Sequence, residues 1–226
     1  MISSTTPVIA IDGPAASGKG TVAKEASRVL DFHYLDSGAL YRLVALKALR
    51  EATPLHDEAA MAATASRLNA VFDNDAIVLD GSEVSAAIRA EAVSEAASRV
   101  AALPGVRSAL LSRQRGFRRP PGLVAEGRDM GTVVFPDAVL KVFVTASPEE
   151  RARRRYNQLI EKGNYITIDG LLRDIRERDA RDSTRTAAPL KAAPGALILD
   201  TTNLTIDAAT AFVVGKYRAL AAAERH

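Results

Sequence analysis

The most constraining feature of this 226-residue chain is a glycine-rich stretch near its start, IDGPAASGKGTVAK at residues 11–24. It follows PVIAID, a short apolar run rich in β-branched residues that predicts a buried strand. From Thr21 to Leu30 the apolar residues recur at helical spacing. Strand, glycine-rich turn and helix in this order predict a phosphate-binding loop, because successive backbone N–H groups can then face one anion at the positive end of the helix.

The loop matches G-x-x-x-x-G-K-[ST] through Gly13, Gly18 and Lys19, but Gly20 stands at the hydroxyl position and Thr21 comes one place late. In motor ATPases and GTPases that hydroxyl binds magnesium. The absence of N-K-x-D and D-x-x-G motifs further disfavours a GTPase. G-K-G-T resembles the loop of nucleoside monophosphate kinases, which implies that Mg²⁺ is held mainly through nucleotide phosphates and water.

Composition favours a globular protein, with 47% hydrophobic and 25% charged residues. No apolar run approaches the ~20 residues needed to span a bilayer, and the N-terminus lacks the pattern of a secretory signal. The chain has no cysteine and its three histidines show no metal-ligand spacing, so we expect a cytoplasmic location and no protein-built metal site. A net charge of +3 without aromatic interleaving disfavours nucleic acid as a partner.

Beyond the loop, apolar runs alternate with helical patterns, which favours an α/β fold with a parallel sheet core flanked by helices. A capping box from Ser147 to Glu150 predicts one helix start, another helix is expected after Asp169, and the last runs from about Ile206 to the C-terminus. The further buried-strand candidates are GLVAE at 122–126, AVLKVFVTA at 138–146 and GALILD at 195–200.

Composition changes between about 55 and 100. LNAVFDNDAIVLDGSEVS at 68–85 predicts two or three short antiparallel strands that turn at DND and DG. A small antiparallel sheet within a chain that otherwise predicts a parallel sheet indicates an insertion. This insertion either has no function of its own or covers a ligand. The predicted division is therefore a P-loop core of residues 1–54 and 101–226, with an inserted region at 55–100.

Arginines recur in three further blocks. An enzyme that moves a phosphoryl group onto another phosphate must hold two polyanions together, which requires cations from several directions. Arg128 and Asp129 follow a buried strand, where open α/β sheets bind ligands. The blocks are HYLDSGALYR at 33–42, EGRDMGTVVFP at 126–136 and RERDARDSTR at 176–185. Taken alone, the last block is also typical of a solvated helix with alternating charges.

The four motifs together resemble bacterial cytidylate kinases. IDGPAASGKGT, YLDSGALYR, VAEGRDMGTVVFPDA and ERDARDSTR occur in the family's order and are spread over almost the whole chain. Adenylate kinases share the loop but not LDSG or GRDMG, so these two motifs are the specific ones. The resemblance implies ATP-dependent phosphorylation of CMP and dCMP to the diphosphates, with residues 55–100 as the monophosphate-binding region and a lid near 151–185.

The resemblance also implies roles for individual residues. Lys19, Arg128 and Arg185 are the expected catalytic residues. The expected ATP contacts are Gly13, Pro14, Ala15, Ala16, Ser17, Gly18, Lys19, Gly20, Thr21 and Arg154. The expected CMP contacts are Ser37, Ser98, Arg107 and Asp129 at the base, Arg42, Arg128 and Arg185 at the acceptor phosphate, and Arg178 and Asp182 at the ribose.

The residue chemistry fits a cytosine pocket. Cytosine presents an amino donor beside the N3 acceptor, which Asp129 and Arg107 can satisfy, whereas uracil would place a carbonyl against the carboxylate. Two alternatives stay open: another small-molecule P-loop kinase acting on UMP, AMP or a non-nucleotide acceptor, and a non-catalytic module that binds ATP or RNA. We expect a monomer that uses neither membrane nor nucleic acid.

Overall fold

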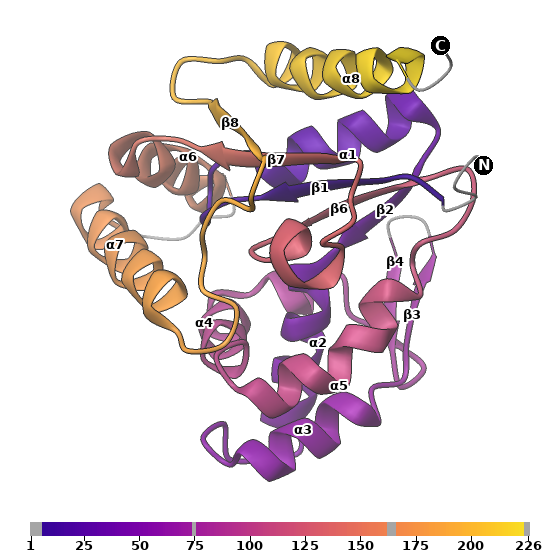
Figure 1. Ribbon diagram of the computed structural model, residues 1–226. Coiled ribbons are helices and arrows are strands. Elements are labelled where there is room, and N and C mark those ends of the chain that lie inside the picture. Colours follow the sequence, from indigo (N-terminus) through magenta and orange to yellow (C-terminus); the bar gives the residue numbers. More distant parts are fainter. Residues whose placement is uncertain (1–5, 74–75, 162–165, 224–226) are drawn as a thin grey trace. The chain divides into compact units, whose positions relative to one another are not determined.

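The computed structural model describes residues 6–73, 76–161 and 166–223 (Figure 1). The chain divides into two compact units. The first unit comprises residues 1–35 and 117–226, and the second unit comprises residues 36–116. The predicted insertion at 55–100 lies within the second unit.

A five-stranded sheet forms the centre of the first unit, in the order β2-β6-β1-β7-β8. The pairings of β1 with β6, β1 with β7 and β7 with β8 are all parallel, which confirms the predicted α/β class with a parallel sheet. The strands are β1 (Val8–Asp12), β2 (His33–Asp36), β6 (Leu123–Gly127), β7 (Leu140–Thr145) and β8 (Leu197–Asp200). Of these five strands, four were predicted from the sequence and β2 was not.

The register of the sheet aligns the carboxyl ends of its strands. Asp12 at the end of β1 is opposite Gly127 of β6 and Phe143 of β7. Thr145 at the end of β7 is opposite Asp200 at the end of β8. The segments that follow these four strands therefore begin at one edge of the sheet, the edge at which open α/β sheets bind ligands.

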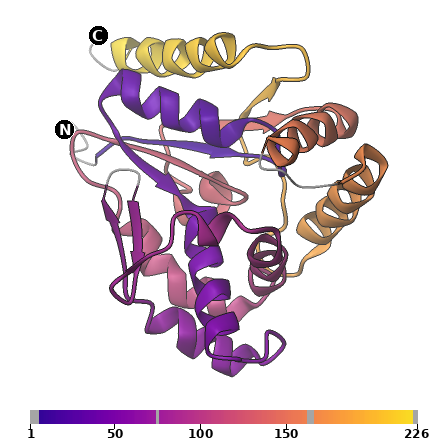
Figure 2. The same cartoon turned by 180° about the vertical axis from the view of Figure 1, so that it is seen from behind.

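Helices α1 (Lys19–Leu30) and α8 (Ile206–Ala223) lie together on one face of this sheet (Figures 1 and 2). Their buried side chains, among them Val22 and Val213, join those of the strands in one apolar cluster. Burial of this cluster is the main stabilising contribution to the first unit. The predicted last helix is confirmed up to Ala223, and residues 224–226 lie outside the described ones.

Helices α6 (Pro148–Ile160) and α7 (Ile168–Thr184) pack against each other through a second apolar cluster. The predicted helix start at Ser147 is confirmed, because its side chain accepts a hydrogen bond from the Glu150 N–H at 3.2 Å. Helix α7 begins one residue before Asp169, with Thr167 as its N-cap. This start is slightly earlier than the predicted one after Asp169, because Thr167 supplies the cap and Asp169 belongs to the first turn.

The second unit is mostly helical. Its three-stranded antiparallel sheet, in the order β3-β4-β5, confirms the predicted antiparallel patch, although residues 74–75 of the DND turn lie outside the described ones. Its buried core includes Leu40, Met61, Ile88, Val100 and Leu110. The elements are α2 (Ser37–Arg50), α3 (Glu58–Ser66), β3 (Ala70–Asp73), β4 (Ala76–Leu79), β5 (Ser82–Glu83), η1 (Ala87–Arg89), α4 (Glu91–Val100) and α5 (Pro104–Arg115).

Asp12 connects the end of the central strand to the turn η2 (Met130–Val134), which follows β6. Its buried carboxylate accepts hydrogen bonds from the N–H groups of Met130 and Gly131, both at 2.8 Å. Burial raises the pKa of Asp12 to about 6, against the lowering effect of these two hydrogen bonds. The folded chain therefore binds the Asp12 proton more tightly than the unfolded chain does.

This raised pKa predicts a stability change with pH. The stabilisation from the Asp12 proton is complete below the unfolded pKa of 3.8 and is lost as the pH rises through about 6. Asp12→Asn does not titrate, so the free energy of unfolding of wild type relative to this variant should fall by about 1–3 kcal/mol between pH 4 and pH 7. Urea unfolding of both proteins at several pH values measures it, and a pH-independent difference would contradict the assignment.

Candidate nucleotide-binding site

The phosphate-binding loop joins β1 to α1, as the sequence predicts, so the expected ATP-binding residues 13–21 form one continuous turn and helix start. Gly13 has a φ of 155°, and a Cβ there would lie 2.0 Å from the Val144 carbonyl oxygen. Gly18, the residue before the helix, has a φ of 86° in the left-handed region. Both motif glycines are thus required by the backbone, one for its close approach to β7 and one for its conformation.

Lys19 begins α1 and is largely buried beside the loop that it follows. Its Nζ donates to the Pro14 carbonyl oxygen at 3.3 Å and lies 3.6 Å from Glu126 Oε2. The ammonium group is therefore held at the loop by one carbonyl and one carboxylate. This position suits a lysine that contacts the phosphates of a bound nucleotide.

Glu126 lies against the glycine that follows the lysine. A Cβ on Gly20 would lie 2.9 Å from Glu126 Oε1, which is closer than real Cβ atoms come to an oxygen. The Tyr34 hydroxyl donates to the same Oε1 at 3.2 Å and helps to hold the carboxylate in place. A side chain at position 20 would therefore have to move this carboxylate, which is the flexible end of a glutamate, so the glycine leaves room for the acidic residue of β6.

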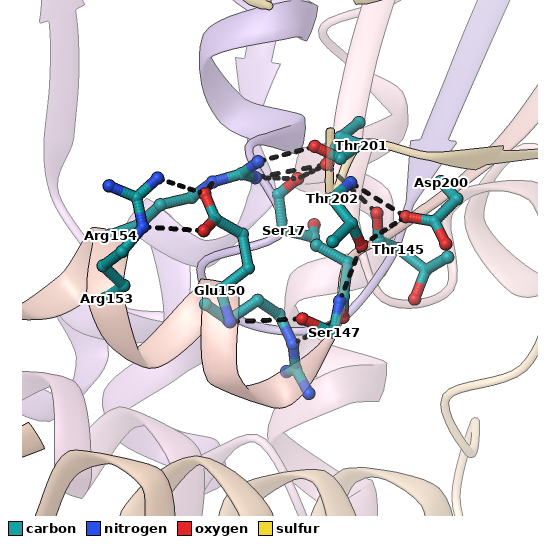
Figure 3. A network of polar contacts seen from close by, with 11 residues as sticks. Ser17, Thr145, Ser147, Glu150, Arg153, Arg154, Asp200, Thr201 and Thr202 are labelled. Carbon is teal, nitrogen blue, oxygen red and sulfur yellow. Dashed lines mark hydrogen bonds and ion pairs between the residues drawn. The ribbon is translucent and has the colours of Figure 1, made fainter. Parts of the chain in front are cut away.

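Arg154, on α6, lies against the outer side of the loop (Figure 3). Its Nη1 donates to the Ser17 carbonyl at 3.3 Å and to Thr201 Oγ1 at 3.1 Å, and its Nη2 donates to the Thr201 carbonyl at 2.6 Å. Its Nε donates to Glu150 Oε1 at 2.8 Å. A contact of Arg154 with a nucleotide phosphate, as the sequence predicts, requires some of these bonds to be exchanged.

Two residues at the loop were missed by the sequence analysis. Arg151 is buried, with Nη1 donating to the Ala15 carbonyl at 3.3 Å and to Asp179 Oδ1 at 3.0 Å. Thr201 is buried as well, and its hydroxyl lies 2.8 Å from the Ser17 carbonyl oxygen. Thr201 directly follows β8, so the rule that ligands bind at carboxyl ends of strands would have pointed to it.

Three of the predicted acceptor residues gather around Asp182 on α7. Arg128 Nε donates to Asp182 Oδ2 at 3.0 Å. Burial raises the pKa of this carboxyl, but the charges of Arg128, Arg178 and Arg185 outweigh it and leave the pKa below its ordinary value. Three guanidinium groups act on this one carboxyl, and such a cluster favours binding of an anion such as a phosphate monoester.

Asp129 lies beside this cluster in sequence and is buried. Its backbone carbonyl accepts hydrogen bonds from the N–H groups of Val133 at 2.9 Å and Val134 at 3.2 Å, which fixes the residue at the start of η2. Its carboxylate is near enough to Asp12 to raise the pKa of that residue. Asp129 is therefore rigidly placed at the carboxyl edge of the sheet.

In the second unit, the LDSG segment forms the start of α2. Asp36 caps the helix by accepting from the Ala39 N–H at 3.0 Å, and Ser37 is buried in the first turn. Arg42 Nη1 lies 3.3 Å from Asp36 Oδ2. The capping carboxylate thus also orients the arginine that the sequence assigns to the acceptor phosphate.

Ser98 and Arg107, the remaining predicted base contacts, lie on α4 and α5. The Arg107 guanidinium lies over the Tyr41 ring, 5.6 Å from its centroid, and its Nη1 donates to the Ala101 carbonyl at 2.9 Å. Ser98 is 6% exposed, and its hydroxyl has no hydrogen-bond partner among the described residues. A buried hydroxyl in this state is costly for the free protein and is suited to a ligand.

Within the described residues, no group of three or more histidine, cysteine, aspartate or glutamate side chains is arranged to hold a metal ion. No helix in the same part of the chain is long and apolar enough to cross a membrane.

Comparisons with known proteins identify the chain's relatives. The family model of cytidylate kinase matches residues 9–219. The cytidylate kinase of Bordetella bronchiseptica is 57% identical over 94% of this chain and 96% of its own length. That of Cupriavidus necator is 58% identical with the same coverage of both chains. Among solved structures, a gluconokinase from Sinorhizobium meliloti 1021 aligns over 98% of this chain and 99% of its own, at 14% identity and a TM-score of 0.49.

The family model and the relatives span both units of the structure and include the loop, the LDSG and GRDMG motifs and the arginine-rich helix. The resemblance predicted from these motifs is confirmed, and the chain belongs to the cytidylate kinase family.

Proposed function

We propose that this protein transfers the γ-phosphoryl group of ATP to CMP and dCMP, giving CDP and dCDP. The observation that carries the proposal is the 57% identity to a cytidylate kinase over 94% of the chain. The predicted rivals, a different P-loop kinase or a non-catalytic ATP- or RNA-binding module, are not favoured by a relationship of this extent.

The loop and Lys19 support binding of the donor. Residues 13–18 leave the backbone N–H groups at the start of α1 for the phosphates of ATP, and the helix dipole favours the same charge. The lysine is already confined at the loop by Pro14 and Glu126. We therefore assign the β- and γ-phosphates of ATP to this loop.

The arginine cluster around Asp182 supports binding of the acceptor phosphate. Its guanidinium groups suit the dianionic phosphate of a nucleoside monophosphate. Arg128 and Arg185 are assigned to that phosphate, and Arg178 and Asp182 to the ribose. Arg42 is assigned to the phosphate as well.

The reaction needs no general base, because the attacking phosphate oxygen is already ionised at neutral pH. Catalysis then consists of positioning the two phosphates in line and stabilising the charge of the transferring group through Lys19, Arg128 and Arg185. Closure of the lid near 151–185 and of the region 55–100 over the nucleotides would exclude water, which otherwise hydrolyses ATP.

The proposed reaction uses Mg²⁺, and Glu126 is the side chain at the loop that suits it. The Glu126 carboxylate lies 2.9 Å from the position of a Cβ on Gly20, where other loops carry the magnesium-binding hydroxyl. Mg²⁺ is commonly bound through one or two carboxylates, phosphates and water. We assign Glu126 as the side chain that would help to hold the hydrated ion, and the ion would supply charge neutralisation at the β- and γ-phosphates.

The base contacts are assigned to Asp129, Arg107, Ser98 and Ser37. A carboxylate at Asp129 accepts from the exocyclic amino group of cytosine, which uracil lacks. The Ser98 hydroxyl, which has no hydrogen-bond partner in the part of the chain that the structure describes, supports a polar ligand at α4. A monomeric state and a cytoplasmic location remain predictions of the sequence.

An acceptor panel tests the proposal. Purified protein with ATP and Mg²⁺ is given CMP, dCMP, UMP, AMP and gluconate in turn, and ADP release is followed by a coupled assay. We expect turnover with CMP and dCMP to exceed that with the other acceptors by at least tenfold in kcat/KM. Faster turnover with any other acceptor, or ATP binding without turnover, would replace the proposal by one of its rivals.

Lys19→Ala should lower kcat by at least 100-fold, about 2.7 kcal/mol of transition-state stabilisation, because the lysine acts on developing charge more than on packing. Steady-state kinetics with CMP give kcat, and circular dichroism checks the fold. Lys24→Ala, on an exposed position of the same helix, serves as a control and should retain wild-type kcat. A folded Lys19 variant with near-normal kcat would refute the role of the loop.

Ser98→Ala should separate stability from substrate binding. Removal of a buried hydroxyl that lacks a partner should leave the free energy of unfolding unchanged or slightly higher. The same change should raise KM for CMP about three- to tenfold, since it removes a hydrogen bond to the base. Ser94→Ala, one turn earlier on α4 and also buried, is the matched control. Unchanged CMP kinetics for Ser98→Ala would remove this residue from the base contacts.

Asp129→Asn tests how the base is selected. The amide keeps the size of the carboxylate but can present an N–H donor to the carbonyl of uracil. We expect kcat/KM for CMP to fall at least tenfold, about 1.4 kcal/mol, with a smaller loss for UMP, so that the CMP/UMP ratio narrows. Both acceptors are measured on wild type and variant. An equal decline for both would indicate that Asp129 only supports its neighbours structurally.

A further inference from the structure

The phosphate-binding loop is held by hydrogen bonds from side chains to its backbone carbonyls. Three loop carbonyls accept from side chains that belong to α1, to α6 and to the segment after β8. The contacts are Lys19 Nζ with Pro14, Arg151 Nη1 with Ala15, and both Thr201 Oγ1 and Arg154 Nη1 with Ser17.

These carbonyl contacts determine where the loop N–H groups point. In a trans peptide the C=O of one residue and the N–H of the next point in opposite directions. A donor that fixes the Ser17 carbonyl on the outer side of the loop thus directs the Gly18 N–H toward the inner, phosphate-binding side. Glycine itself does little to fix this plane, because its backbone is the least restricted of all residues.

Thr201 is well suited to fix the Ser17 carbonyl. It is 3% exposed, and its N–H donates to the Thr145 carbonyl at 2.8 Å, which ties it to the end of β7. Its hydroxyl has one proton and two acceptors nearby, the carbonyls of Ser17 at 2.8 Å and Thr145 at 3.1 Å. The shorter contact is favoured, since the Thr145 carbonyl already accepts the Thr201 N–H.

Thr201 also holds Arg154 (Figure 3). Its hydroxyl oxygen accepts from Arg154 Nη1 at 3.1 Å and its carbonyl accepts from Nη2 at 2.6 Å. The same arginine reaches the Ser17 carbonyl. Threonine, arginine and loop carbonyl therefore form a closed set of hydrogen bonds.

We propose that Thr201 is a positioning residue for the donor nucleotide. Its hydroxyl holds the Ser17–Gly18 peptide with the N–H toward the phosphates of ATP and keeps Arg154 against the loop. Thr201 itself touches no reacting atom. The inference rests on the proposed function only in taking the donor to be a nucleoside triphosphate.

Thr201→Val tests this inference, because valine keeps the shape and removes the hydroxyl. We measure Kd for ATP and for ADP by calorimetry, KM for ATP and for CMP, and thermal unfolding. We expect a three- to tenfold weaker ATP and ADP affinity, in line with loss of one hydrogen bond, and a KM for CMP within twofold of wild type. Thr201→Ser, which restores the hydroxyl, should bind ATP as wild type does.

Thr202→Val is the matched control. The neighbouring threonine accepts from the Ser147 N–H at 3.0 Å and donates to Asp200 Oδ1 at 2.6 Å, so it supports the same segment without these bonds reaching the loop. Its ATP affinity should lie within twofold of wild type. If Thr201→Val does not fold, Thr201→Ala supplies the same comparison.

Three results would overturn the inference: wild-type ATP affinity in a folded Thr201→Val, equal losses for ATP and CMP, or the same loss in Thr202→Val. Failure of the proposed function has a different signature, since wild-type protein would then bind ATP without phosphorylating CMP. In that case the ATP and ADP titrations still decide the role of Thr201.

Discussion

Parallel pairing of β1 with β6 on one side and β7 on the other decides where the chemistry of the first unit lies. Because parallel strands end at the same edge of a sheet, the phosphate-binding loop, Arg128 and the segment after β8 all start from one edge. The apolar cluster between the sheet, α1 and α8 holds this register without using any residue of the loop. A stable core therefore supports the part of the site that begins at the ends of these strands.

Several cations of the site form salt bridges with acidic side chains. Lys19 pairs with Glu126, Arg128 with Asp182, and Arg154 with Glu150. A partly buried cation without a partner is costly, so these carboxylates stabilise the free protein and also orient the cations. The phosphates of the substrates then compete with these carboxylates for the cations. Around Asp182, where three guanidinium groups act on one carboxyl, this competition favours a bound phosphate.

Much of the fold is predictable from local patterns. The strands β1, β6, β7 and β8, the capping box at Ser147 and the antiparallel patch at 68–85 follow from the spacing of apolar and turn residues. The strand β2 is different, because HYLD is short and carries polar residues at both ends. Its extended conformation depends on its place at the edge of the sheet, which a local pattern does not contain.

The candidate site is predictable in part for the same reason. Residues whose type and short motif suggest a role, such as Lys19 and Arg128, are predicted from the sequence. Arg151 and Thr201 are not, because an arginine in a charged helix and a threonine after a strand are common and gain their role only from the backbone atoms that they contact.

By itself, the sequence determined the phosphate-binding loop, the parallel α/β class and the family, since these depend on short motifs and on periodicity along the chain. Only the tertiary structure decided which carboxylate lies beside Gly20 and which hydroxyl holds the Ser17 carbonyl of the loop. The first belongs to Glu126 at the end of β6, and the second to Thr201, 184 residues after Ser17. Contacts of this kind are set by the order of the strands in the sheet, which brings distant residues to one edge and which no local pattern of residues specifies.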